Sequence, residues 1–213
     1  MDKILYSSQK KYLEQFLKNN DSLIDEMEIF AKENKIPILK KDSIWFLEII
    51  INLLKPKFVL ELGTAIAYSS IRIARNLNEK SVIYTIEKSK DNLAIAKENI
   101  KKSGYDKKIN LIFGNALEVL PKLDEKFDLV YLDADKLDYK NLFDLTLPLL
   151  KKGGVIFVDN LLWHGFAATS KVPKEQRLST RIIRQFNVMF TSHPELKSTI
   201  LPIGDGIGLG IKI

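Results

Sequence analysis

The chain has 213 residues, of which 46% are hydrophobic and 28% charged, and its formal net charge at pH 7 is +6. These values are typical of a folded globular protein and exclude a disordered chain or a collagen-like fibre. The sequence contains no cysteine, which excludes a disulfide scaffold. No stretch approaches the ~18 uninterrupted apolar residues of a membrane span, and no apolar signal segment opens the chain. We therefore expect a cytoplasmic protein without a membrane partner.

Lysine supplies most of the positive charge, because only five arginines occur, three of them between positions 177 and 184. Scattered lysines usually lie on a solvated surface, so the net charge alone does not identify a partner. On one helix, Arg177, Arg181 and Arg184 would share a face. That face could bind phosphate groups, or its arginines could form salt bridges with their own neighbours.

Residues 1–55 are predicted to form a helical N-terminal extension, because their apolar side chains recur at helical spacing. Asp21 or Ser22 should cap the second of these helices, and Asp42 or Ser43 the third. The third helix should stop before Pro56, because the residue that precedes a proline disfavours the helical conformation.

From residue 57 onward, short apolar runs alternate with amphipathic segments. The runs predict strands at 58–62, 81–86, 109–113, 127–132 and 155–158, with helices between them and a long helix over 174–190. Two last runs, 199–202 and 206–212, flank a Gly204-Asp205-Gly206 turn and should pair antiparallel. This order predicts an α/β fold in one domain over residues 1–213. Its sheet would be doubly wound, seven-stranded and mostly parallel, with an antiparallel C-terminal pair.

The carboxyl ends of the strands are the expected ligand site of such a sheet, and each of the first five ends in polar or small residues. The turn after the first strand has a single glycine, Gly63. It therefore lacks the three spaced glycines of a dinucleotide-binding fingerprint, which disfavours a nucleotide-dependent dehydrogenase. Glu87 ends the second strand, where an acidic side chain can accept both ribose hydroxyls of a nucleoside. The alternative for Glu87 is a surface carboxylate.

Asp133, Asp159 and Asn160 follow the fourth and fifth strands. Neighbouring strands lie ~4.8 Å apart, so these side chains should be close together. Two carboxylates and an amide carbonyl suit a hard cation such as Mg²⁺. The alternative is that Asp159 and Asn160 only cap a turn.

Six motifs together resemble the cation-dependent O-methyltransferase family, which includes catechol and caffeoyl-CoA O-methyltransferases. They are E-L-G-T-A-I-A-Y-S at 61–69, Y-T-I-E ending at Glu87, G-N-A at 114–116, D-A-D-K at 133–136, V-D-N at 158–160 and P-I-G-D-G at 202–206. The match runs from about Pro37 to the C-terminus. It implies a Rossmann-like class I methyltransferase fold, and family members are commonly dimers, so it also implies a homodimer.

The resemblance implies a role for most of these strand ends. S-adenosyl-L-methionine would be bound by Leu39, Glu61, Gly63, Ser69, Glu87, Asn115, Ala116 and Asp133. Mg²⁺ or another divalent cation would be held by Asp133, Asp159 and Asn160. An acceptor with two neighbouring oxygens would chelate this cation, which lowers the pKa of its hydroxyl. Lys136 would be catalytic together with Asp133, and would stabilise the reacting oxygen or accept its proton.

Two residues depart from the family pattern. Ala67 stands where glycine is usual and would cost ~1–2 kcal/mol if the position needs a positive φ. Asn115 stands where aspartate is usual; it keeps a carbonyl acceptor and adds donors, so we expect altered contacts with adenine. Neither departure removes a metal ligand, and we expect activity.

Within the family, the sequence most resembles the bacterial enzymes that methylate 5-hydroxyuridine at the tRNA wobble position to 5-methoxyuridine, through segments 31–38, 61–72 and 193–206. The resemblance implies tRNA as a partner, bound near its anticodon. Trp163 would stack on a flipped base, and Arg177, Arg181 and Arg184 would contact phosphates.

Two alternatives remain open. One is a small-molecule acceptor of the catechol or caffeoyl-CoA type. The other is a module that binds S-adenosylmethionine or RNA and has lost catalysis, which the intact Asp133, Lys136, Asp159 and Asn160 argue against.

Overall fold

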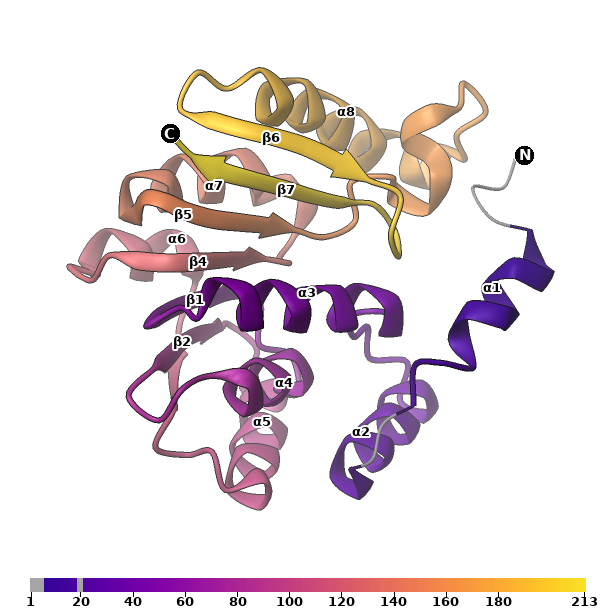
Figure 1. The fold of residues 1–213 in the computed structure, drawn as a ribbon. Helices are drawn as coiled ribbons and strands as arrows, with labels where there is room; N and C mark the ends of the chain where they lie inside the picture. The colour runs from indigo at the N-terminus through magenta and orange to yellow at the C-terminus, as the bar shows by residue number, and fades with distance from the viewer. Residues whose placement is uncertain (1–5, 19–20) are drawn as a thin grey trace.

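The computed structural model describes residues 6–18 and 21–213. Its centre is a seven-stranded sheet in the order β3-β2-β1-β4-β5-β7-β6, with helices on both faces (Figure 1). The strands are β1 (Phe58–Leu62), β2 (Val82–Glu87), β3 (Ile109–Phe113), β4 (Phe127–Leu132), β5 (Leu150–Val158), β6 (Leu196–Leu201) and β7 (Ile207–Lys212). Strands β1 to β5 are parallel, whereas β7 runs antiparallel to β5 and β6. The predicted Rossmann-like α/β fold is confirmed.

Helices cover both faces of the sheet. They are α1 (Ser7–Glu14), α2 (Ser22–Glu33), α3 (Lys41–Leu54), α4 (Tyr68–Asn76), α5 (Lys90–Ser103), α6 (Ala116–Val119), α7 (Tyr139–Thr146) and α8 (Arg177–Ser192). Figure 1 shows α3, α4 and α5 in front of the sheet and α6, α7 and α8 behind it. In the described ranges 6–18 and 21–213, no helix is both long and apolar enough to cross a membrane.

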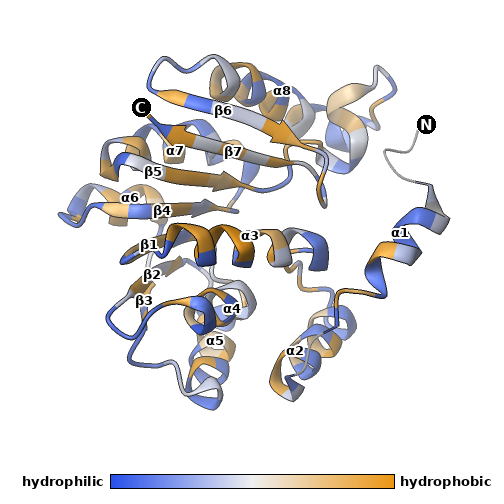
Figure 2. Ribbon diagram, in the orientation of Figure 1, coloured by the Kyte–Doolittle hydropathy of each residue, from blue (hydrophilic) through white to orange (hydrophobic). Residues whose placement is uncertain are grey.

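Two hydrophobic cores result from the alternation of side chains along the strands. In β4, Leu129 and Tyr131 pack with α2 to α5, whereas Val130 and Leu132 pack with α7 and α8. Both faces are covered, so β1 and β4 are hydrophobic along most of their length (Figure 2).

The predicted boundaries hold with three corrections. Asp21 caps α2 and accepts hydrogen bonds from the next turn, as expected. The third helix starts two or three residues earlier than predicted, at Lys41 with Lys40 as its N-cap, so neither Asp42 nor Ser43 is its cap. Asp42 instead accepts a hydrogen bond from the backbone N–H of Gly204 at 3.0 Å, a partner 162 positions away.

The other two corrections concern strand starts. Strand β5 starts at Leu150 rather than 155, because the glycines that indicated a turn form an irregularity within the strand; Gly153 has φ +78° and the register with β4 shifts there. Strand β6 starts at Leu196 rather than 199, because its first residues pair with the end of β7.

Ala67 precedes α4 with φ +68°, in the left-handed region. The condition under which this alanine was expected to be costly is therefore met, and the side chain costs ~1–2 kcal/mol relative to glycine.

Phe143 is fully buried in the core behind the sheet and contacts the rings of Phe186 and Phe190, with centroids at 5.8 and 6.1 Å. We expect Phe143→Ala to lower the free energy of unfolding by ~3–5 kcal/mol, because it removes buried contacts and leaves a cavity. Urea denaturation measures this change. Phe16→Ala is the control, because Phe16 is 61% exposed; an equal loss in both variants would contradict the core assignment.

Candidate active site

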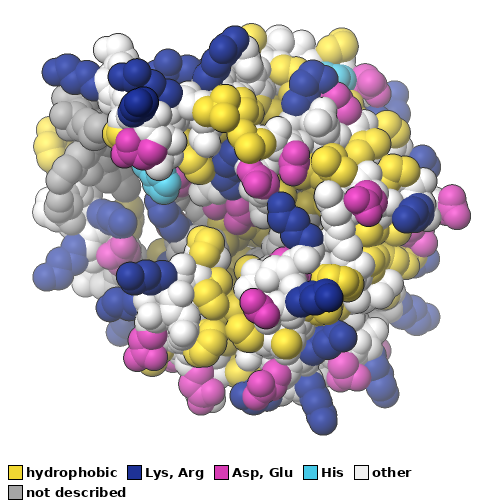
Figure 3. Space-filling model, turned by 180° about the vertical axis from the view of Figure 1, so that it is seen from behind, with side chains coloured by type: hydrophobic (Ala, Val, Ile, Leu, Met, Phe, Trp, Pro, Cys, Tyr) yellow, Lys and Arg dark blue, Asp and Glu magenta, His cyan; other side chains and the backbone are white. Residues whose placement is uncertain are grey.

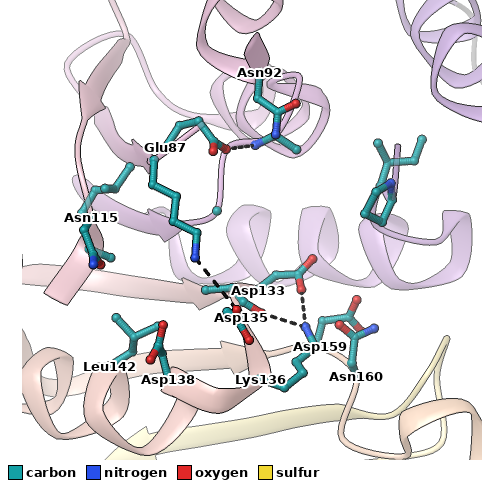
Figure 4. Close-up of a pocket in the computed structure, with 18 of the residues that line it drawn as sticks. Glu87, Asn92, Asn115, Asp133, Asp135, Lys136, Asp138, Leu142, Asp159 and Asn160 are labelled. Atoms are coloured by element: carbon teal, nitrogen blue, oxygen red, sulfur yellow. Dashed lines mark hydrogen bonds and ion pairs between the residues drawn. The ribbon is translucent and has the colours of Figure 1, made fainter. Parts of the chain in front are cut away.

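A cavity of about 540 Å³ lies at the carboxyl ends of all five parallel strands. Its wall includes residues that follow each of them, among them Gly63 after β1, Glu87 at the end of β2, Asn115 after β3, Asp133 after β4 and Asp159 after β5. The volume is in the range of small-molecule sites. The predicted ligand site is therefore a cavity, and Figure 4 shows how these side chains surround it.

Gly63 allows the turn after β1 to touch the segment after β4. It has φ +102°, and a Cβ atom here would collide with the backbone carbonyl oxygen of Asp133. The N–H of Asp133 donates to the carbonyl of Leu62 at 3.0 Å, which continues the β1–β4 pairing into the cavity wall. Only glycine permits this close approach at this φ.

Glu87 and Asn115 mark the end of the cavity where the sequence places a nucleoside. The Glu87 carboxylate accepts backbone hydrogen bonds from Ala65 at 2.8 Å and Ser89 at 2.7 Å, and only 7% of the residue is exposed. Asn115 is exposed and caps α6 by accepting from Leu117 at 3.1 Å. Ala116 also lines the cavity.

Three of the predicted cofactor residues lie behind the cavity wall. Leu39 is 4% exposed and belongs to the hydrophobic core, while the preceding Pro37 and Ile38 line the cavity. Ser69 is 8% exposed in the first turn of α4, and Glu61 is fully buried in β1.

Glu61 is a buried carboxylate with one oxygen unsatisfied. Its Oε2 accepts hydrogen bonds from the hydroxyls of Ser70 and Thr85, the latter at 2.6 Å. Its Oε1 has no hydrogen-bond partner in the described part of the chain. Burial raises the pKa of Glu61 to about 7, against hydrogen bonds that lower it, and the charge of Asp133 raises it further. A cationic ligand group such as an α-ammonium would satisfy Oε1.

Asp133, Asp159 and Asn160 come together as predicted and line the same part of the cavity (Figure 4). Asp159 is 4% exposed, and its Oδ1 has no hydrogen-bond partner among the described residues. Burial, together with the charge of Asp133, raises the pKa of Asp159 to about 7. An unpartnered buried carboxylate beside a second carboxylate and an amide is the donor set that a hard divalent cation takes.

Asn160 is needed to complete such a donor set. Across residues 6–18 and 21–213, no group of three or more His, Cys, Asp or Glu residues could hold a metal ion. A cation here would have two carboxylates and the Asn160 amide as ligands, and Asn160 stands in the left-handed region with φ +63°.

Lys136 lies beside the carboxylates of Asp133 and Asp159, and its ammonium group donates three hydrogen bonds. Its Nζ donates to Asp133 Oδ1 at 3.0 Å, to the carbonyl of Ala134 at 3.1 Å and to the hydroxyl of Tyr139 at 2.7 Å. The Tyr139 hydroxyl in turn donates to the carbonyl of Asp159 at 3.1 Å, and Tyr139 is fully buried. Tyr139 thus connects the lysine to the fifth strand. Sequence reasoning missed it, although it stands three residues after Lys136.

Sequence reasoning also missed several residues of the cavity wall, which are Pro37, Lys88, Asn92, Asp135, Asp138 and Leu142. Lys88 and Asp135 form an ion pair across the cavity at 3.9 Å (Figure 4). Lys88 and Asp135 each lie next to a predicted residue, so the signal for these two was their position at the strand ends.

The residues predicted to contact RNA fall into two groups. Trp163 lines the cavity beside His164. Arg184 donates to the carbonyls of Phe166, Ala167 and Thr169, so it holds the segment between β5 and α8.

The other two arginines, Arg177 and Arg181, are exposed on α8, and Arg177 donates to the carbonyl of Val172 at 3.4 Å. Seen from behind, lysine and arginine side chains are spread among acidic ones rather than gathered in one patch (Figure 3).

Glu61→Gln should stabilise the protein without cofactor at pH 8, because it removes a buried charge. The unfolded chain ionises at the ordinary pKa of 4.5 and the folded chain at about 7, so stability falls as the pH rises through this window. The variant should therefore gain about 3 kcal/mol at pH 8, and the gain should shrink towards pH 5. Urea unfolding at both pH values measures this gain. Glu79→Gln, on an exposed turn, is the control, and equal changes in both variants would contradict the account.

Comparison with known proteins gives the family of this chain. A family model described as O-methyltransferase matches residues 9–213. The chain is 33% identical over 172 residues to a caffeoyl-CoA O-methyltransferase of Populus kitakamiensis, covering 77% of this chain and 73% of that protein. It is also 33% identical over 177 residues to a catechol O-methyltransferase of Niastella koreensis, covering 78% of each.

A solved structure shares both the fold and part of the sequence. The O-methyltransferase TomG of Streptomyces achromogenes, in complex with S-adenosylmethionine, superposes with a TM-score of 0.85. The two chains are 25% identical, and the match covers 100% of this chain and 99% of TomG. Together with the cavity at the strand ends, these matches show that the chain belongs to the O-methyltransferase family and support S-adenosylmethionine as its cofactor.

Proposed function

We propose that this protein transfers the methyl group of S-adenosylmethionine to a hydroxyl of a small acceptor with two neighbouring oxygens, of the catechol or caffeoyl-CoA class, with the help of a divalent cation. The observation that carries the proposal is the unpartnered buried oxygen of Asp159 beside Asp133 and Asn160. The named relatives act in this class: one is a caffeoyl-CoA and another a catechol O-methyltransferase.

We assign different roles in the reaction to the residues in and behind the cavity wall. Glu87 and Asn115 would bind the nucleoside of the cofactor, and Glu61 would attract its ammonium group, so that the methyl group lies towards Asp133. Asp133, Asp159 and Asn160 would hold Mg²⁺ or a similar cation, which when bound lowers the pKa of an acceptor hydroxyl.

Lys136 would act on the reacting oxygen. Its ammonium would stabilise the negative charge that develops there, or as an amine it would accept the proton. Trp163 and Ile38, which also line the cavity, would exclude water and contact the flat acceptor.

A second candidate acceptor is 5-hydroxyuridine in tRNA. Its 5-hydroxyl and 4-oxo groups form a chelating pair like that of a catechol. The resemblance of segments 31–38 and 193–206, the net charge of +6 and the position of Trp163 at the cavity support it. On the face seen from behind, charge complementarity to a polyanion would be diffuse, because the basic side chains there are spread among acidic ones (Figure 3).

Removal of divalent cations should abolish methyl transfer. Protein treated with a chelator is assayed with S-adenosylmethionine and either a catechol or undermodified tRNA, before and after addition of Mg²⁺. We expect activity on the catechol to fall at least ~10³-fold without metal and to return with it, because cation polarisation supplies several kcal/mol.

Asp159→Ala should lose activity, and Mg²⁺ should not restore it. Asp124→Ala should behave as the unaltered protein, because Asp124 is exposed and precedes the amino end of β4. Full activity of the chelated protein would overturn the proposal. Methylation of tRNA but not of catechol would replace the first acceptor by the second.

Tyr139→Phe should lower kcat about tenfold with little change in the KM for S-adenosylmethionine, because it removes the hydroxyl that directs Lys136 but keeps the ring. Steady-state kinetics with each substrate varied separately measures this split. Tyr105→Phe is the control, because Tyr105 is not among the residues that line the cavity. A parallel rise in KM for the cofactor, or an unchanged kcat, would show that the hydroxyl serves the fold rather than the lysine.

A further inference from the structure

The P-I-G-D-G motif at 202–206 forms the turn between β6 and β7, and no role has so far been assigned to it. Its Asp205 is 5% exposed although it carries a carboxylate. The turn packs against residues 160–165, which follow β5 and which we name the acceptor loop. This loop carries Asn160, Trp163 and His164 to the cavity wall.

The acceptor loop has an unfavourable backbone conformation. Asn160, Trp163 and His164 have φ values of +63°, +48° and +56°, all in the left-handed region, and Gly165 follows with +82°. Side chains of L-residues disfavour this region, so such a segment keeps its shape only when surrounding groups hold it.

Asp205 makes several of the contacts that keep the acceptor loop in this conformation. Both oxygens of its carboxylate accept the backbone N–H of His164, at 2.8 and 3.0 Å. Its own carbonyl accepts the N–H of Leu162 at 2.8 Å, and the carbonyl of Gly206 accepts the N–H of Leu161 at 2.9 Å. Three N–H groups of the loop thus bind two consecutive residues of the turn.

The two glycines of the motif permit these contacts. A Cβ atom on Gly206 would lie 2.6 Å from the backbone nitrogen of Leu162, so a larger residue would push the acceptor loop away. On the other side, the N–H of Gly204 donates to Asp42 in the first turn of α3. Hydrogen bonds of the turn therefore link the acceptor loop to α3, which packs on the face of the sheet opposite to α8.

We propose that Asp205 is a positioning residue for the acceptor: its carboxylate holds the acceptor loop so that Trp163 and Asn160 line the acceptor end of the cavity. The kinetic part of this inference rests on the proposed function. The nucleoside end of the cavity comes from other elements, β2 with Glu87 and the β3–α6 segment with Asn115. Asp205 should therefore affect the acceptor and leave cofactor binding unchanged.

The first experiment needs no activity. In a Trp45→Phe background Trp163 is the only tryptophan, and its fluorescence reports on the acceptor loop. Asp205→Ala should raise acrylamide quenching of Trp163 at least about twofold. The acceptor loop then loses the carboxylate that accepts the hydrogen bond of the His164 N–H, and it opens. Asp205→Asn, whose amide oxygen still accepts the His164 N–H, should stay close to the parent. Asp124→Ala, an exposed aspartate at the amino end of β4, is the matched control.

The second experiment measures binding and turnover of the same variants. Titration calorimetry with S-adenosylhomocysteine should give a Kd within about twofold of the parent for all of them, which also shows that each has folded. In methyl transfer, Asp205→Ala should raise the KM for the acceptor about tenfold, and Asp205→Asn should restore it.

The outcomes separate the two proposals. Unchanged quenching of Trp163 in Asp205→Ala would overturn the positioning role, whatever the activity. A tenfold loss of S-adenosylhomocysteine affinity would also overturn it, because Asp205 would then serve the whole cavity. Increased quenching in a protein that methylates neither catechol nor tRNA would leave the positioning role standing and overturn only the proposed function.

Discussion

The burial of carboxyl groups at one edge of the sheet is the constraint on which the site depends. Glu61, Glu87 and Asp159 are 0%, 7% and 4% exposed, and all stand at or just after the ends of parallel strands. Burial of a carboxylate costs free energy unless donors or cations compensate it. Glu87 is compensated by backbone N–H groups, but Glu61 and Asp159 each keep an oxygen without a partner in the described structure. A cationic group could therefore pair with each of these oxygens: an ammonium group of a cofactor with Glu61, behind the cavity wall, and a divalent metal ion with Asp159, in the wall.

The backbone makes this concentration of charge possible. Parallel strands end at the same edge, and the β1 and β4 ends are brought into contact because Gly63 has no side chain. The same arrangement places Lys136 next to Asp133, where its ammonium offsets part of the negative charge while Tyr139 directs it. Left-handed residues concentrate around the cavity, at Ala65 and Ala67 after β1 and at Asn160, Trp163 and His164 after β5. Strain of this kind is typical of functional segments, where the surrounding contacts hold a conformation that ligand binding uses.

Much of the fold and of the candidate site could be predicted because their signals are local. Apolar runs such as 58–62 and 127–132 indicate buried strands by themselves, and the polar residue that ends each run must lie at the edge of the sheet. Residues such as Asp42, Tyr139 and Arg184 could not be interpreted in this way. Their partners are Gly204, Asp159 and the carbonyls of 166–169, and a hydrogen bond between residues distant in sequence leaves no periodic pattern. The start of β5 was misplaced for a related reason, since Gly153 and Gly154 indicate a turn locally but lie within β5, at the point where its register with β4 shifts.

The sequence by itself therefore determined the α/β class, the order of the strands along the chain and the set of polar residues at their ends. Those properties follow from hydrophobic periodicity and from side-chain chemistry, which act over a few neighbouring residues. Only the tertiary structure decided which oxygens remain without a partner, how Lys136 is directed, and that Asp205 holds the loop that carries Asn160 and Trp163. These properties depend on distances between elements, and such distances are set when the two cores pack on opposite faces of the sheet.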